Sequence, residues 1–151
     1  MPVYDSQGHW DSAFPMDPNK YLGFIYLVTN LLNGKKYVGK KNYKHGGKTY
    51  HKRADGSKQT NYRKGTDTNW RDYTGSSEDL NADIEEFGID NFEFRVIREY
   101  KTRGGLHYAE CNLQHKRNVL TATLPNGERA YYNKTISAVK FLPKEYYEDV
   151  I

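Results

Sequence analysis

Tyr26 and Tyr37 lie in two short apolar runs that flank an Asn33-Gly34 pair, the strongest short signal for a β-hairpin turn. In a hairpin closed by an even-numbered loop, residues whose numbers sum to an odd value share a face, so both phenols should emerge on one side. They are staggered if the loop is Asn33-Gly34 alone, and directly opposite if the loop comprises residues 30–33. A pair of core tyrosines is the alternative interpretation.

Glu110 is the most informative acid, because it lies four residues after Leu106 and three before Leu113, along the buried edge of an expected helix. A carboxylate there needs an arginine, hydrogen bonds or a metal ion as partner. An ion pair with Arg117 or Arg95 is one hypothesis. Together with the two phenols and a basic segment, the carboxylate predicts metal-assisted hydrolysis of a phosphodiester.

A competing constellation occupies the same expected helix, where His107, Cys111 and His115 follow one another at intervals of four residues. Such spacing could supply zinc ligands and make the protein a zinc-stabilised interaction domain. One helix presents only two adjacent positions to one ion, and the chain has no second cysteine. We therefore favour surface histidines beside a buried thiol.

The net charge of +4 conceals a strong asymmetry. Between Lys35 and Arg71 there are 12 Lys or Arg against two acids, giving +10, whereas the rest of the chain has 11 against 17, giving −6. A one-sided basic segment interleaved with aromatic residues favours a nucleic acid as partner over a merely solvated loop. The interleaved aromatic residues include Tyr43, Tyr50 and Tyr62, and the candidate DNA contacts are Lys40, Lys44, Lys48, Lys52, Arg53, Arg63, Lys64 and Trp70.

The elements that must position these residues alternate in type, which predicts an α/β fold of the α+β kind: a compact sandwich whose small mixed or antiparallel sheet opens with a hairpin and is flanked by helices. An irregular arm over residues 1–20, held by Trp10 and Phe14, precedes a single domain over residues 21–151. Strands are expected at 24–29, 35–39 and 91–97, the last from the alternation of Phe92, Phe94 and Val96. One helix is expected from a Ser76-Ser77 cap to Gly88, with an apolar face of Leu80, Ile84 and Phe87. After a break at Gly104-Gly105, a second helix is expected from Leu106 to Leu120, with Leu106, Leu113 and Leu120 facing inward. The other expected elements are a long basic loop at 42–69, a turn at 124–128, an extended segment at 129–133 and a short helix after residue 137.

Size and composition are those of one globular domain: 151 residues, of which 36% are hydrophobic and 28% charged. No apolar run approaches the roughly 20 residues that a spanning helix needs, and no signal peptide opens the chain. A single cysteine, Cys111, fits a reducing compartment. We therefore expect a cytoplasmic protein with no membrane partner.

The residues above, taken in order, resemble the GIY-YIG nuclease family. Its two motifs appear as Phe24-Ile25-Tyr26 and Tyr37-Val38-Gly39, with the tyrosines eleven positions apart. Residues 70–97, 108–114 and 131–136 are similar to the central part, the acidic helix and the late asparagine segment of small stand-alone nucleases from bacteriophage genomes. The resemblance covers residues 22–136, most of the chain.

The resemblance implies a metal-dependent DNA endonuclease, either phage-encoded or of the homing type. Glu110 would match the single ligand of one Mg²⁺ or Mn²⁺ ion. Tyr26 would match the general base and Tyr37 the group that orients the water or the scissile phosphate. Asn133 would position the acidic helix or the substrate.

The chain departs from the family pattern where an arginine is expected on a helix soon after the second motif. Arg71, with Tyr73 two residues later, is the first candidate for this phosphate clamp, and Lys41 is the second, although a lysine lacks the planar fork of a guanidinium. A catalytically inactive DNA-binding module is therefore the alternative function. We expect modest sequence preference, and either a monomer that nicks or a transient dimer on DNA that cuts both strands.

Overall fold

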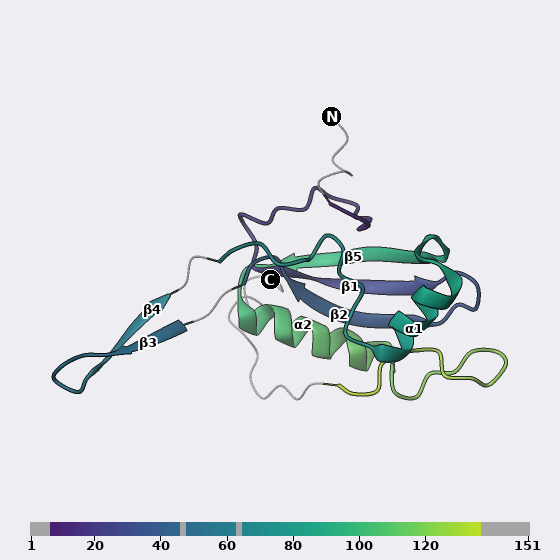
Figure 1. The fold of residues 1–151 in the computed structure, drawn as a ribbon. Coiled ribbons are helices and arrows are strands. Elements are labelled where there is room, and N and C mark those ends of the chain that lie inside the picture. Colours follow the sequence, from purple (N-terminus) through teal and green to yellow (C-terminus); the bar gives the residue numbers. More distant parts are fainter. Residues whose placement is uncertain (1–6, 46–47, 63–64, 137–151) are drawn as a thin grey trace, which may run out of the picture.

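A three-stranded antiparallel sheet with the strand order β2-β1-β5 forms the centre of the fold (Figure 1). The computed structural model describes residues 7–45, 48–62 and 65–136. β1 (Gly23–Asn30) lies between β2 (Lys36–Asn42) and β5 (Phe92–Tyr100), and nearly all of its residues are buried because both of its faces and both of its edges are covered. β2 and β5 are the edge strands of this sheet.

The two helices lie on opposite faces of the sheet, which makes the fold a three-layer sandwich. Leu80 of α1 (Glu78–Phe87) joins a buried cluster with Phe24 and Val28, whereas Leu106 of α2 (Arg103–Lys116) packs on Ile25. Alternate residues of β1 thus contact different helices, as the pleat of a strand requires. The predicted α+β sandwich with an antiparallel hairpin is confirmed.

The caps of α1 follow the sequence signals closely. The side chain of Ser77 accepts a hydrogen bond from the Leu80 N–H, and Gly88 ends the helix with φ +91°, a conformation that favours glycine. A short 3₁₀ turn, η2 (Ile89–Asn91), then leads into β5. The expectation that Phe87 faces inward is wrong, because 39% of its surface is exposed.

The first hairpin has a register between the two that the sequence allowed. Tyr26 lies opposite Gly39 and Tyr37 opposite Val28, so the tyrosines share a face and are offset by two residues. Residues 31–35 connect the strands, the Asn30 N–H donates to the Lys35 carbonyl at 2.8 Å, and within the Asn33-Gly34 pair only Gly34 has a positive φ, +82°. The predicted shared face is confirmed, whereas neither of the two expected loops, residues 33–34 or residues 30–33, is the one observed.

The second helix begins earlier and ends earlier than expected. Gly104 and Gly105 lie inside its first turn, because the Thr102 side chain caps the helix by accepting a hydrogen bond from the Gly105 N–H at 3.0 Å. Leu106 is buried, but Leu120 lies beyond the helix and is 42% exposed. The predicted break at the two glycines and the inward position of Leu120 are therefore wrong.

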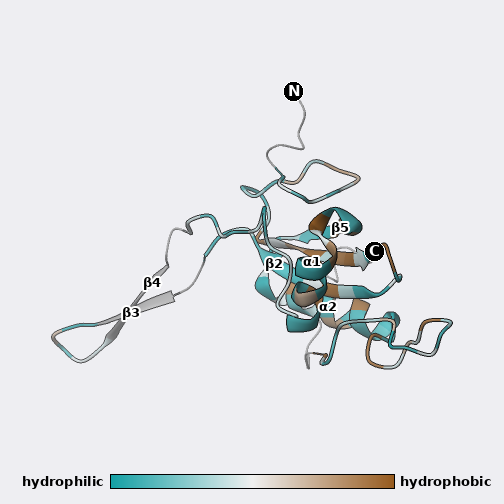
Figure 2. Cartoon of the chain, turned by 45° about the vertical axis from the view of Figure 1, so that its right-hand side comes forward, coloured by the Kyte–Doolittle hydropathy of each residue, from teal (hydrophilic) through white to brown (hydrophobic). Residues whose placement is uncertain are grey.

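Residues 42–69 contain a β-hairpin where the sequence suggested a long loop. β3 (Lys48–Lys52) and β4 (Lys58–Tyr62) pair in antiparallel register, from Lys48 opposite Tyr62 to Lys52 opposite Lys58. We call these two strands and their connecting turn the ribbon. It projects away from the sandwich, and its tip is hydrophilic, in contrast to the apolar segments of the central sheet (Figures 1 and 2).

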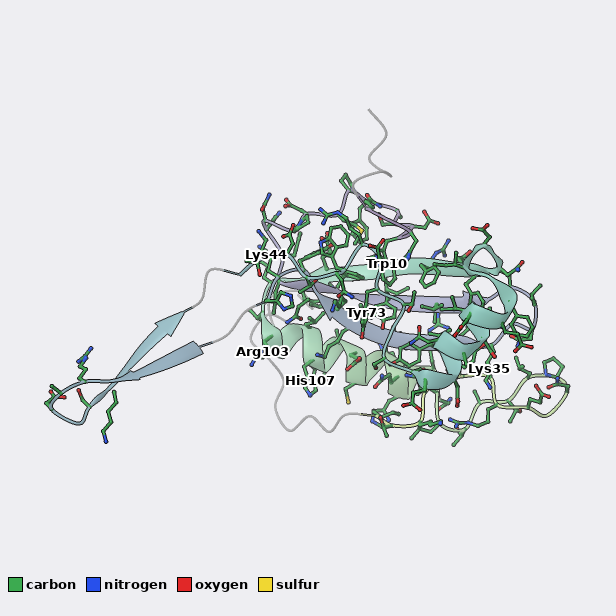
Figure 3. All side chains as sticks on the ribbon, in the orientation of Figure 1. Trp10, Lys35, Lys44, Tyr73, Arg103 and His107 are labelled. Atoms are coloured by element: carbon green, nitrogen blue, oxygen red, sulfur yellow. The ribbon has the colours of Figure 1, made fainter. Side chains whose placement is uncertain are left out.

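The described part of the N-terminal arm is irregular, as predicted, and it is attached along the free edge of β5. Asp11 donates its backbone N–H to the Phe94 carbonyl and accepts from the Val96 N–H, each at 2.8 Å. Trp10 is 2% exposed and belongs to the core cluster between the arm and the sheet (Figure 3). The connection after α2 contains the expected turn at residues 124–128, in which the Leu124 N–H donates to the Glu128 carbonyl at 2.7 Å and the Gly127 N–H donates to the Leu124 carbonyl at 2.9 Å.

The helix expected after residue 137 lies outside the described residues. Within the described part of the chain, no helix has the length and apolar character that crossing a bilayer would need.

Candidate active site

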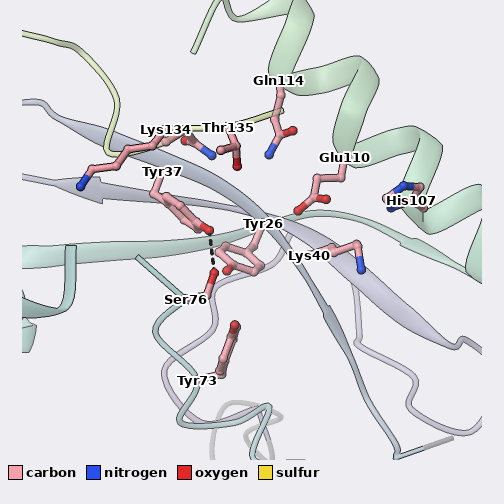
Figure 4. Close-up of a pocket in the computed structure, with 11 residues that line it drawn as sticks. Tyr26, Tyr37, Lys40, Tyr73, Ser76, His107, Glu110, Gln114, Lys134 and Thr135 are labelled. Carbon is pink, nitrogen blue, oxygen red and sulfur yellow. Dashed lines mark hydrogen bonds between the residues drawn. The ribbon is translucent and has the colours of Figure 1, made fainter. Parts of the chain in front are cut away.

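A pocket of about 380 Å³ opens at the outer edge of β2, where side chains from both faces of the sheet can meet (Figure 4). It receives residues from β1, β2, α2, the segment before α1 and the segment after residue 132. Its lining comprises Tyr26, Tyr37, Lys40, Tyr73, Ser76, His107, Glu110, Gln114, Asn133, Lys134 and Thr135. Five of the seven predicted catalytic residues line the pocket, namely Tyr26, Tyr37, Tyr73, Glu110 and Asn133, whereas Arg71 and Lys41 do not.

Tyr26 forms the floor of the pocket, and its ring needs two glycines beside it. The ring lies so close to Gly39 that an added Cβ would sit 2.5 Å from its Cζ and closer still to its hydroxyl. At Gly75, which has φ +98°, an added Cβ would lie 3.3 Å from the same hydroxyl. The glycine of the Tyr37-Val38-Gly39 motif thus makes room for the tyrosine of the other motif.

Three phenols converge at this point. The Tyr37 hydroxyl is hydrogen-bonded to the Ser76 hydroxyl at 3.1 Å. The Tyr26 ring centroid lies 6.2 Å from that of Tyr37 and 6.3 Å from that of Tyr73, the latter in an edge-on arrangement. Figure 4 shows the hydroxyl ends of Tyr37 and Tyr73 directed toward the space in front of Tyr26.

Glu110 extends from α2 toward the same space (Figure 4). Burial raises the pKa of its carboxyl group, and the charges of Lys40 and His107, together with a hydrogen bond from the Lys40 backbone, offset part of that increase in pKa. Burial also raises the pKa of the Tyr26 phenol well above its usual value, and the proximity of Tyr37, Tyr73 and Glu110 adds to that increase. A cation in the pocket would counter both effects.

Asn133 connects the last described segment to the edge of the sheet. Its amide oxygen accepts from the Val38 N–H at 3.0 Å, and its amide nitrogen donates to the Val38 carbonyl at 2.8 Å. Gln114 donates to the same carbonyl from α2 at 3.3 Å, while its buried oxygen has no hydrogen-bond partner among the residues that the structure describes. These two side-chain amides fix β2 at Val38, the residue directly after Tyr37.

The cations are arranged differently from the sequence prediction. Lys40, predicted only as a DNA contact, lies in the pocket, and neither of the proposed replacements for the family arginine does. Arg71 stacks on Trp70, with 4.3 Å from its Cζ to the ring, and pairs with Asp67 at 3.7 Å. The Lys41 ammonium lies 4.1 Å from the Tyr73 ring centroid, and partial burial lowers its pKa.

Several predicted DNA contacts occupy other environments. Trp70 is 1% exposed and packs edge-on against Tyr43, which is fully buried, so both rings belong to the core and their assignment as DNA contacts is corrected. Lys44 lies 4.0 Å from the Asp67 carboxylate. Lys52 and Arg53 are exposed at the end of the ribbon, whereas the Lys48 side chain, Arg63 and Lys64 fall outside what is described.

The histidine and cysteine constellation does not assemble a zinc site in the described structure. No group of three or more His, Cys, Asp or Glu side chains suited to a metal ion occurs among the described residues. Cys111 is buried and His115 exposed, so they face different environments, and His107 lines the pocket. Around Glu110 the available donors are instead carboxylate, phenol and amide oxygens, which are hard ligands of the type that Mg²⁺ prefers.

Five pocket residues were missed as site residues from the sequence: Ser76, His107, Gln114, Lys134 and Thr135. Two of them had a usable signal, because His107 lies three residues before Glu110 and Gln114 four residues after it, on the same face of the helix. Ser76 and the pair after Asn133 reach the pocket through long-range packing that no local pattern reports.

Comparisons with known proteins agree with the order of these residues. A family model described as "Putative endonuclease segE, GIY-YIG domain" matches residues 9–136. A curated protein of Enterobacteria phage T4, "Putative endonuclease segE", is 27% identical over 110 residues, which are 73% of this chain and 39% of that protein. The chain thus spans well under half the length of this relative. No solved structure matches the chain.

Proposed function

Because the chain belongs to the segE-type GIY-YIG domain family, we propose that it is a divalent-metal-dependent endonuclease that hydrolyses phosphodiester bonds in double-stranded DNA. The observation that supports this most is the common pocket of Tyr26, Tyr37 and Glu110, which come from β1, β2 and α2. Phenols and a carboxylate next to a lysine form a set that can position a phosphate and a water molecule.

Glu110 is the proposed ligand of one Mg²⁺ or Mn²⁺ ion. Its carboxylate fits this role because it is half-buried, has a raised pKa and lacks a close salt bridge in the described structure. When bound, such an ion supplies positive charge that neutralises the phosphate and the leaving oxygen. Lys40 and His107 would favour the ionised carboxylate, because their charges lower its pKa and offset part of the increase that burial causes.

The tyrosines are the proposed proton-transfer and orienting groups. Tyr26 would act as a base only as the phenolate, the form that nearby cations favour, and would then accept a proton from the attacking water at its oxygen. Tyr37, hydrogen-bonded to Ser76, would orient that water or the scissile phosphate. Lys40 would contact a non-bridging phosphate oxygen as a point charge, in the place that an arginine fork occupies in the family pattern. Asn133 acts through Val38 as a positioning residue for β2.

A catalytically inactive DNA-binding module is the second candidate, and one observation favours it. Among the described residues that line the pocket there are two lysines but no arginine. Because one such pocket occurs in the described part of the chain, an active enzyme would nick one strand at a time, and a double-strand break would need a dimer or two successive nicks.

Nicking of a supercoiled plasmid with Mg²⁺ or Mn²⁺ tests the proposal. Glu110→Gln and Tyr26→Phe should each slow cleavage by at least about 10²-fold, the usual contribution of a proton-transfer group. Glu86→Gln, at an exposed acid of α1, is the matched control and should cleave like the wild type. Full cleavage by Glu110→Gln would refute the metal-ligand role, and the absence of cleavage by the wild type with any divalent ion would favour the inactive module.

Lys40→Ala and Lys41→Ala separate the two lysines that follow the second motif. The first should lose cleavage and the second should retain most of it, because only Lys40 lines the pocket. The opposite order would show that the phosphate approaches from the Tyr73 side of β2.

A further inference from the structure

The ribbon is long, narrow and set apart from the catalytic pocket. Its five paired residues on each strand correspond to a length of about 17 Å, compared with a depth of about 8.5 Å and a width of about 12 Å for the major groove of DNA. Two-stranded ribbons of this kind fit that groove. The side chains drawn at its tip lie well away from the sandwich in Figure 3.

Hydrogen bonds within residues 53–57 stabilise the turn at the tip of the ribbon, although these residues are exposed. Arg53 donates its backbone N–H to the Ser57 carbonyl at 2.8 Å, and Gly56 turns the chain with φ +88°. The carboxylate of Asp55 accepts hydrogen bonds from the backbone and the hydroxyl of Ser57. The one acid of residues 48–62 thus serves the turn, and all of residues 52–57 are exposed.

The last pair of the ribbon opposes two like charges. Lys52 lies directly across from Lys58, an arrangement that weakens an antiparallel pair, and Arg53 follows immediately. Residues 48–62 carry four Lys or Arg against one Asp, or +3, while the chain outside residues 35–71 carries −6. An unfavourable cationic pair at an exposed tip is explained by a polyanionic partner, which would also meet the net charge of +7 that residues 35–47 and 63–71 carry.

The register divides the ribbon into two chemically different faces. By the alternation of a pleated pair, Thr49 and His51 share a face with Gln59 and Asn61, all of them hydrogen-bonding residue types. We call this the polar face. The opposite face, the basic face, comprises Lys48, Tyr50, Lys52, Lys58, Thr60 and Tyr62.

From these observations we propose that the ribbon enters the major groove of double-stranded DNA with its polar face toward the base edges. Gln and Asn form paired hydrogen bonds with adenine, and a threonine methyl group contacts thymine. Phosphates line the rims of the groove, at the level where the lysines of the basic face and Arg53 would lie. This inference rests on the proposed function, because it assigns sequence preference of that same nuclease to Thr49, Gln59 and Asn61.

The major groove of an RNA duplex is too narrow for such a ribbon. Double-stranded RNA should therefore compete poorly with DNA of the same sequence. Equal competition by RNA would overturn the groove assignment and indicate binding by charge alone.

The test uses the full chain without divalent ions, so that binding is measured apart from cleavage. Lys52→Thr/Lys58→Thr removes two charges from the basic face, and Lys20→Thr/Lys116→Thr removes two exposed charges elsewhere. Threonine keeps the preference for strands. We expect the slope of log affinity against log salt to fall by about 2 for the first pair on all sequences, and to stay near the wild-type value for the control. Equal slopes for the two pairs would overturn the proposal.

Gln59→Val/Asn61→Val removes hydrogen-bonding groups from the polar face without changing charge. Selection from randomised DNA should show that its discrimination between preferred and random sequences falls at least about five-fold, while its salt slope stays unchanged. Retained discrimination, or a wild type without any preference, would overturn base reading by this face. Gln59→Val alone, with thermal unfolding of each variant, guards against a ribbon that no longer forms.

Cleavage of the same DNAs with Mg²⁺ or Mn²⁺ separates the two proposals. If the wild type binds as expected but never cleaves, the nuclease assignment fails and the ribbon assignment stands. If it cleaves while the ribbon variants retain wild-type slope and preference, the reverse holds.

Discussion

Gly39→Ala should disable the pocket without removing any of its functional groups. The added Cβ would lie 2.5 Å from Cζ of Tyr26 and 3.0 Å from Cε2 of Tyr37. Since carbon atoms pack comfortably at about 3.5 Å, the Tyr26 ring must retreat by about 1 Å. A displacement of that size in a catalytic group can cost about 10²-fold in rate, and overpacking costs about 1–3 kcal/mol of stability.

Gly127→Ala provides a control with a similar loss of stability. Gly127 has φ +86° and nothing within 4 Å of an added Cβ, so alanine there costs about 1–2 kcal/mol through backbone strain alone. Both variants should therefore show lower thermal unfolding midpoints. In plasmid nicking at 20 °C or below, where both remain folded, only Gly39→Ala should lose about 10²-fold in kcat. A Gly39→Ala protein with wild-type kcat would refute the claim that the position of the Tyr26 ring beside Gly39 matters for cleavage.

Three further predictions concern the supports of the pocket. Asn133→Ala removes two buried hydrogen bonds to Val38 and should lower the free energy of unfolding in urea by about 2–4 kcal/mol. His9→Ala removes the 2.8 Å contact of Nε2 with the Tyr73 carbonyl and should lower kcat several-fold with little change in KM, while His9→Gln, which keeps a donor, should restore part of kcat. Burial raises the pKa of Tyr132 from 10.0 to about 12, so the folded state loses stability as pH rises from 10 to 12, and Tyr132→Phe should flatten that part of the unfolding curve.

A specific result would contradict each of these three predictions. An Asn133→Ala protein as stable as the wild type would mean that water replaces both bonds. Equal kcat for His9→Ala and the wild type would show that the arm does not position the Tyr73 segment. A Tyr132→Phe protein with the wild-type slope above pH 10 would assign the alkaline loss to other tyrosines.

The parts of the fold that the sequence predicted are those fixed by local chemistry. The Ser77 cap, the Gly88 stop and the alternation of Phe92, Phe94 and Val96 each report on neighbouring residues, and all were confirmed. The shared face of the two tyrosines follows from strand parity alone and needed no knowledge of the turn. At Gly104-Gly105 the local signal failed, because a threonine cap outweighed the low helix propensity of two glycines.

The parts of the site that escaped prediction depend on contacts between distant segments. Trp70 seemed available to DNA because it stands among cations in the sequence, yet it fills the core beneath the arm, where it accepts a hydrogen bond from Trp10 at its carbonyl. Burial of Trp70 also fixes Arg71 outside the pocket. The choice of Lys40 over Lys41 depends on the position of β2 at the sheet edge, which one sequence does not reveal.

The pKa shifts of Tyr26 and Glu110 explain why the proposed cleavage reaction would depend on a cation bound in the pocket. Burial holds the Tyr26 phenol in its neutral form, and the carboxylate of Glu110 disfavours a second negative charge beside it. Replacing Glu110 by an uncharged residue would ease ionisation of Tyr26 but would also remove the proposed cation site, so the acid has opposite effects in the free and the assembled states. The Glu110 carboxylate thus opposes ionisation of Tyr26 in the free protein, but it would also bind the cation whose positive charge favours that ionisation. Burial therefore keeps Tyr26 un-ionised in the free protein, and the proposed role of Tyr26 as a base would require a cation bound beside Glu110.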